Sequence, residues 1–150
     1  EFRRVLFRSV PYKGGGPAAI DLVAGNVQFS FNTASAQVGL WKAGKLRAIA
    51  VISPKRQALF PELPAVSETV PGYGVNNWYG FFVPAKTSPA IVRALNTEIN
   101  NILKMQDIVT LHNSAGIIPL GSTPEAFAKY IASETEKWAK VIKEANIKLE

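Results

Sequence analysis

Three consecutive glycines at residues 14–16 form the part of this sequence best suited to binding a ligand. Tyr12 and Lys13 precede them, and Pro17 follows, where it fits the first position of a helix whose N-cap is Gly16. Without Cβ atoms, the turn lets a ligand approach the backbone closely. The free N–H groups and the positive dipole end of a helix N-terminus favour carboxylate or phosphate. This stretch therefore predicts an anion-binding loop, to which Lys13 adds a mobile positive charge.

The glycine stretch does not match either common nucleotide-binding fingerprint. A P-loop places its lysine after the glycines and follows it with serine or threonine, whereas Lys13 precedes them. The dinucleotide pattern Gly-x-Gly-x-x-Gly needs a glycine where Ala19 stands. A glycine-rich turn that binds nothing is the alternative, and a lone triple glycine favours that alternative until the rest of the chain is considered.

Groups that could perform catalysis are scarce in the remaining sequence. The absence of cysteine excludes thiol catalysis, zinc–thiolate sites and disulfides. The only histidine, His112, has no second histidine or carboxylate four residues further on, which favours a surface position over a metal ligand or a general base. We therefore expect no metal site, no cofactor and no enzymatic activity, and we interpret Asp21 as a solvent-facing charge on the helix behind the glycines.

The length of 150 residues suits one domain or part of a larger protein. Residues 1–9 resemble the in-frame translation of a sequencing-adapter oligonucleotide, so we treat them as an assembly artefact outside the fold. A basic arm that contacts nucleic acid or membrane is the alternative. No initiating methionine or signal peptide precedes Val10, which predicts that the chain is a C-terminal fragment.

The formal net charge of +6 includes three arginines within residues 1–9, and the other basic residues are scattered. This distribution favours mild attraction of anions and argues against a nucleic-acid interface.

Helix and strand signals alternate along the first half of the chain. Short apolar or alternating runs predict strands, and capping residues followed by periodic apolar positions predict helices. This order predicts an α/β fold with a parallel sheet. Prolines and glycines break regular structure at 53–77, and we interpret 70–79 as a linker between two packing units. We expect helices at 17–24, 34–43, from 89 to about 104, and at 124–145. After a break near Met105 we expect a further short helix through Leu111 that ends at Gly116. Strands are expected at 27–31, 46–52, 78–84 and 117–120.

Several stretches in this order resemble the Bug family, the extracytoplasmic solute receptors of tripartite tricarboxylate transporters. The resemblance covers residues 10–150. It is carried by VPYKGGGPA at 10–18, KAGKLRAIAV at 42–51, PELPAV at 61–66, PGY at 71–73 and WYG at 78–80.

The resemblance implies a type II periplasmic binding-protein fold, in which two α/β lobes enclose an organic anion. This sequence would supply only the second half of that fold. Residues 10–75 would form the lobe-two portion with the glycine loop, and residues 76–150 the returning portion of lobe one. The resemblance places the lobe-two binding loop at Tyr12, Lys13, Gly14, Gly15 and Gly16.

Asn32 follows a predicted strand at a helix N-terminus, so it would either hydrogen-bond the ligand or simply cap the helix.

The leading hypothesis is therefore a periplasmic, monomeric receptor. It would capture a small organic carboxylate and pass it to the membrane components of a tripartite tricarboxylate-type transporter, without binding nucleic acid. The alternative is an anion-handling α/β enzyme domain whose catalytic residues lie in a missing N-terminal half. A third reading is a fragment with no activity of its own, because half of the cleft would be absent.

Overall fold

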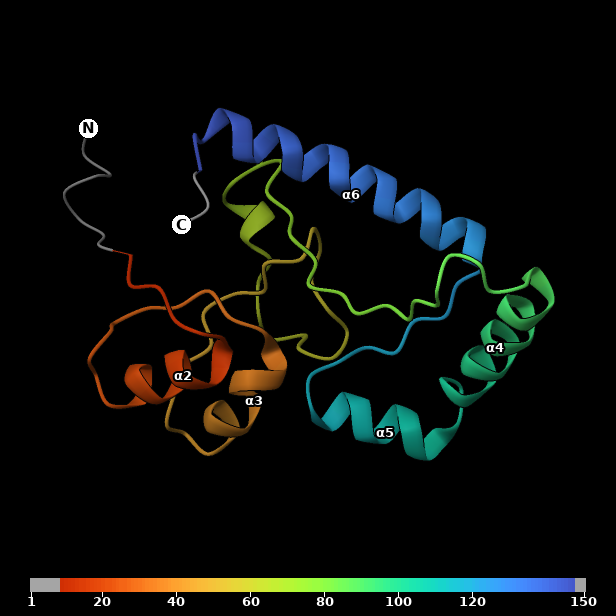
Figure 1. Cartoon of the computed structure of the whole chain (residues 1–150). Helices are drawn as coiled ribbons and strands as arrows, with labels where there is room; N and C mark the ends of the chain where they lie inside the picture. Colours follow the sequence, from red (N-terminus) through yellow and green to blue (C-terminus); the bar gives the residue numbers. More distant parts are fainter. Residues whose placement is uncertain (1–8, 148–150) are drawn as a thin grey trace. The chain divides into compact units, whose positions relative to one another are not determined.

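The structure is a computed structural model that describes residues 9–147, and its regular elements are helical (Figure 1). The expectations for residues 1–8, that they are an artefact or a basic arm, lie outside the described residues. The elements are α2 (Gly15–Val23), α3 (Ala34–Lys42), the 3-10 turn η1 (Val66–Glu68), α4 (Pro89–Ile102), α5 (Gln106–Ser114) and α6 (Pro124–Glu144).

The predicted start of α4 and of α6 is confirmed, because both starts are encoded by adjacent residues. Each helix has proline at its first position, after a hydroxyl residue at the N-cap. The Ser88 hydroxyl accepts a hydrogen bond from the N–H of Ile91 at 3.4 Å. The Thr123 hydroxyl accepts one from the N–H of Ala126 at 3.1 Å. Each cap satisfies an N–H that has no partner within its own helix.

The four predicted strands are not formed within the described range. A single parallel bridge joins Val51 to Ala65, and the rest of these segments is irregular. The expectation that 78–84 is buried is also wrong, because Tyr79 is 73% exposed and Phe81 is 76% exposed. An apolar run predicts an extended segment, but a strand also needs a neighbour for its N–H and C=O groups. The pattern carries no information about that neighbour.

The described residues form two compact units. The first unit runs to Tyr79 and also contains Leu111–Ile118, whereas the second contains Gly80–Thr110 and the residues from Pro119 onward. The boundary that we expected at 75/76 lies close to this division. The return of Leu111–Ile118 to the first unit has no signal in the sequence, because it depends on tertiary packing.

The core of the first unit is small. Helices α2 and α3 pack against each other (Figure 1), and the buried apolar residues are Ala19 on α2, Val38 on α3 and Ala65 near η1. The rings of Trp41 and Phe60 meet edge to face with centroids 5.5 Å apart.

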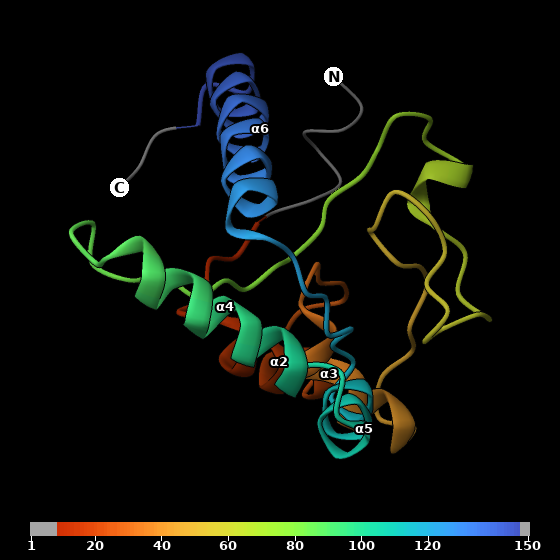
Figure 2. The same ribbon diagram turned by 90° about the vertical axis from the view of Figure 1, so that its right-hand side faces the viewer.

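The second unit is built around α4 and α6, which are in contact and are both drawn in Figure 2. The side-chain amides of Asn96 and Asn100 on α4 donate to the carbonyl of Ser122, just before α6, at 2.9 and 3.1 Å. The rings of Phe82 and Phe127 lie 5.6 Å apart. A Cβ at Gly80 would collide with the Phe127 ring, so this close approach requires glycine.

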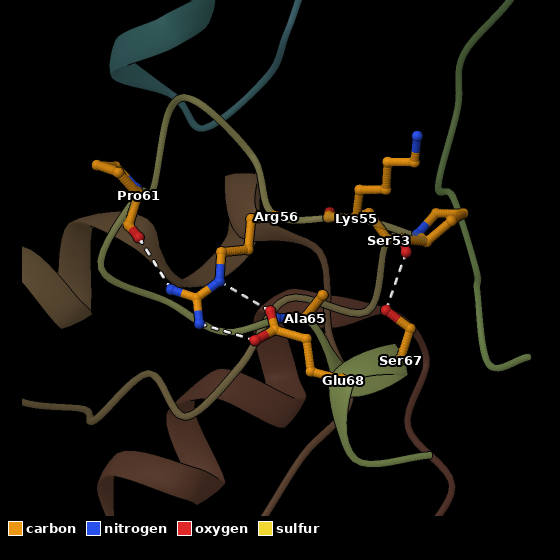
Figure 3. A network of polar contacts seen from close by, with 8 residues as sticks. Ser53, Lys55, Arg56, Pro61, Ala65, Ser67 and Glu68 are labelled. Carbon is orange, nitrogen blue, oxygen red and sulfur yellow. Dashed lines mark hydrogen bonds and ion pairs between the residues drawn. The ribbon is translucent and has the colours of Figure 1, made fainter. Parts of the chain in front are cut away.

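A polar network organises the proline-rich region of the first unit, which has little regular structure (Figure 3). Nε and Nη2 of Arg56 donate to the two carboxylate oxygens of Glu68, each at 2.8 Å. One of these oxygens also accepts from the N–H of Ala65 at 2.8 Å. The Ser67 hydroxyl donates to the carbonyl of Pro54 at 2.9 Å. The bidentate pair therefore links residues twelve positions apart.

The pairing makes part of the stability of this region depend on pH. The hydrogen bonds from Arg56, followed by the N–H of Ala65, lower the pKa of Glu68 from 4.5 to about 2. A carboxylate with a lowered folded-state pKa stabilises the fold above its unfolded pKa, and this contribution is lost as the pH falls toward the folded pKa. Both side chains are about half exposed, so the contribution is modest.

We therefore predict that the free energy of unfolding falls less in Glu68→Gln than in the wild type when the pH is lowered from 4.5 to about 2. Urea unfolding followed by circular dichroism at several pH values measures this dependence. Glu62→Gln, at an exposed acid of the same region, is the matched control. An equal pH dependence in the wild type and in Glu68→Gln would contradict the assignment.

Candidate anion-binding site

The glycine loop enters helix α2 earlier than the sequence predicts. The helix begins at Gly15 and its N-cap is Gly14, so the expected N-cap at Gly16 is wrong. Pro17 stands at the third helical position, where its missing N–H is still harmless because the first four N–H groups have no helical partner. Gly14 has φ +109°, a backbone conformation that favours glycine.

The N–H groups of this loop have no hydrogen-bond partner in the part of the chain that the structure describes. Among the interactions of residues 9–147, none gives a hydrogen bond to the backbone N–H of Gly14, Gly15 or Gly16. Gly14 and Gly16 are exposed, and Gly15 is half-buried. Unpaired donors at the positive end of a helix dipole suit a carboxylate or a phosphate. Lys13, which directly precedes them, is exposed.

Asn32 is brought to the glycine loop from a position seventeen residues further on. Its side-chain N–H donates to the carbonyl of Gly15 at 3.0 Å, and its side-chain oxygen accepts from the N–H of Thr33 at 2.8 Å. A Cβ at Gly15 would lie 2.5 Å from that oxygen. Asn32 therefore fastens the loop to the start of α3, whose N-cap is Thr33.

Tyr12 is held by Asp21, through a hydrogen bond that the sequence did not predict. Its hydroxyl donates to the Asp21 carboxylate at 2.7 Å, and the side-chain amide of Asn26 donates to the other oxygen at 3.1 Å. The bond from Tyr12, followed by that from Asn26, holds the pKa of Asp21 below its usual value. The same bond raises the pKa of Tyr12. Asp21 is therefore a hydrogen-bonded anchor that keeps contact with solvent, and the sequence did not predict its two hydrogen bonds.

A hollow of about 230 Å³ lies beside Asn32 in the first unit. Its volume falls below the 300–1,000 Å³ that is typical of small-molecule pockets. It is lined by Phe31, Asn32, Thr33, Ile52 and Asn77.

The loop offers backbone donors of the kind that suit an anion. Residues 9–147 contain no cluster of three or more His, Cys, Asp or Glu side chains that could hold a metal ion. None of the helices described in that range is both long and apolar enough to cross a membrane.

The comparisons with known proteins identify the class of protein. The model of the tripartite tricarboxylate transporter family receptor matches residues 3–147. The chain belongs to this receptor family, which confirms the resemblance to the Bug proteins.

Two curated relatives support the assignment. A protein encoded in the tcbD–tcbE intergenic region of Pseudomonas sp. (strain P51) is 39% identical over 90% of this chain and 41% of its own length. Protein BugT of Bordetella pertussis is 34% identical over 93% of this chain and 43% of its own length.

Solved structures support the same family assignment. R. palustris Rpa4515 with adipate superposes with a TM-score of 0.84 at 33% identity, over 92% of this chain and 46% of that one. MatC of Rhodopseudomonas palustris with bound malate superposes with a TM-score of 0.75 at 29% identity, over 89% of this chain and 47% of that one. The chain therefore has part of a two-lobed periplasmic binding-protein fold of type II, and it spans less than half the length of these relatives.

Two neighbouring glycines give a sharp test of the loop geometry. We predict that Gly15→Ala lowers the free energy of unfolding, because its Cβ would meet the Asn32 oxygen at 2.5 Å and displace the bond to the Gly15 carbonyl. Gly16→Ala places its Cβ in open space within a helix, so it should be neutral or stabilising by up to about 1 kcal/mol.

Urea unfolding of both variants measures the difference, and equal stability of Gly15→Ala and Gly16→Ala would contradict the described position of Asn32.

Proposed function

We propose that this chain is part of a periplasmic receptor that binds a small organic carboxylate for a tripartite tricarboxylate-type transporter. The observation that carries the proposal is the set of three N–H groups at Gly14, Gly15 and Gly16, which have no hydrogen-bond partner among the described residues, in a chain of this receptor family. A carboxylate oxygen can accept from several of these donors at once, and the dipole of α2 adds to the attraction.

The residues predicted from the sequence take different parts in this proposal. The amides of residues 14–16 contact the anion, and the exposed ammonium group of Lys13 raises the local anion concentration. Both functional groups of the Asn32 amide already bond within the protein, so Asn32 supports Gly15 and is not the primary ligand contact.

The site and the structural neighbours support a dicarboxylate as the ligand class. Adipate and malate, which are present in two structural neighbours, both carry two carboxylates. We propose that the glycine loop holds one carboxylate, and that residues beyond this chain hold the rest of the ligand, since the chain spans less than half of those proteins.

The proposal includes no reaction catalysed by the chain. The receptor would act in the periplasm as a monomer. It would close on its ligand and then deliver the ligand to the membrane components of the transporter.

A hybrid protein tests the proposal. Residues 10–147 would replace the matching part of the adipate-bound Rpa4515 protein, and titration calorimetry would measure the binding of adipate and malate. We expect at least one dicarboxylate to bind and the neutral diamide of adipate not to bind. A hybrid that melts cooperatively but binds neither dicarboxylate would refute the proposed function.

Gly15→Asp in this hybrid should weaken carboxylate binding by about thirtyfold or more, because like charges placed together cost several kcal/mol. Its Cβ would also meet the Asn32 side chain. Gly39→Asp adds the same charge on α3, where a Cβ has open space, and should change the affinity by less than about threefold. Unchanged affinity in Gly15→Asp would show that the loop is not the binding element.

A further inference from the structure

We propose that Asp21 is a positioning residue that holds the glycine loop in its open, anion-binding conformation by anchoring Tyr12. This inference rests on the proposed function, since it names a residue that acts on the same site. The carboxylate is on α2, the helix that carries the loop, and the tyrosine lies on the other side of the glycines.

The geometry of the anchor explains why it acts on the loop. Asp21 is six positions beyond Gly15, which corresponds to about 9 Å along a helix that rises about 1.5 Å per residue. Its 2.7 Å hydrogen bond to Tyr12 therefore brings the tyrosine side chain back along α2. The backbone between Tyr12 and α2 passes through Gly14, whose φ is +109°. The anchor closes a ring from Tyr12 to Asp21 that contains Lys13 and the three glycines.

The other end of the loop is fastened separately. Asn32 binds the Gly15 carbonyl at 3.0 Å, so it fixes the start of α2 but not the residues before Gly14. Three glycines in a row have more conformational freedom than any other sequence of this length. Among the hydrogen bonds that the structure describes within residues 9–147, the Tyr12–Asp21 bond is the one that fastens the segment before Gly14. The two fastenings together limit the directions in which the three N–H groups can point.

A carboxylate is an unexpected anchor near an anion site, and its partners account for it. Asp21 accepts from Tyr12 on one oxygen and from Asn26 on the other, so both oxygens have donors. At about 9 Å in water, its repulsion of a bound carboxylate changes affinity by only about twofold. A charged acceptor forms a stronger hydrogen bond with the tyrosine hydroxyl than a neutral one. The gain from a firmly held glycine loop therefore exceeds the loss of about twofold in affinity that the Asp21 charge causes.

Nuclear magnetic resonance of the 150-residue chain provides a test that needs no ligand. Backbone 15N relaxation of Gly14, Gly15 and Gly16 would be compared between the wild type, Tyr12→Phe, Asp21→Ala and Asp21→Asn. We expect Tyr12→Phe and Asp21→Ala to increase the mobility of these three amides while the amides of α3 are unchanged. Asp21→Asn keeps an oxygen acceptor and should restore most of the wild-type rigidity.

Asn26→Ala is the matched control, because it removes the second bond to Asp21 and leaves the bond from Tyr12. It should leave the mobility of the three glycine amides close to that of the wild type. Unchanged relaxation in Tyr12→Phe and Asp21→Ala would overturn the inference. A loss of order throughout α2 and α3 in Tyr12→Phe would also overturn it, because the bond would then be a general packing contact.

The second readout is carboxylate affinity in the hybrid with Rpa4515. We expect Tyr12→Phe and Asp21→Ala to weaken dicarboxylate binding by about tenfold, and Asp21→Asn to stay within about threefold of the wild type. Equal affinity in all variants would contradict the positioning role even if mobility changed. If the hybrid binds no carboxylate while the glycine amides respond as expected, the proposed function fails and the anchoring role of Asp21 stands.

Discussion

The constraint that explains most of this structure is the need of every backbone N–H and C=O group for a partner. Helices meet it within one segment, so α4 and α6 form wherever a cap and an apolar stripe are present. Strands meet it only through neighbours, and among the described residues just one bridge, between Val51 and Ala65, satisfies the strand-like segments. The glycine loop is the third case, because no hydrogen bond within residues 9–147 reaches its N–H groups, and our proposal gives these groups a ligand as their partner.

The strand-like segments match a solved receptor although they form no sheet within residues 9–147. The chain superposes on Rpa4515 with a TM-score of 0.84 and covers 46% of it. The backbone path of these segments is therefore that of the matching part of a receptor, whereas their pairing is limited to the bridge between Val51 and Ala65. The rings of Phe29 and Phe31 pack on each other at 5.0 Å and stay 48% and 65% exposed.

Sequence reasoning succeeded where the determinants were local. Ser88 and Thr123 marked helix starts correctly because a cap needs only residues up to three positions away. It placed the start of α2 two residues late because three glycines encode no single backbone conformation. It identified the glycine loop by composition, but it could not see that Asn32 would bond to Gly15 or that Tyr12 would bond to Asp21. Both contacts depend on how the chain returns on itself, and the ligand contacts remain a prediction.

The exposure of Phe81 and Phe82 has a consequence for the behaviour of this polypeptide in solution. Exposed aromatic rings on segments without strand partners are a common starting point for association between polypeptides. When the 150-residue polypeptide is concentrated, this segment would therefore be the first to stick to a second copy, and salt or temperature would change its solubility before they unfold its helices.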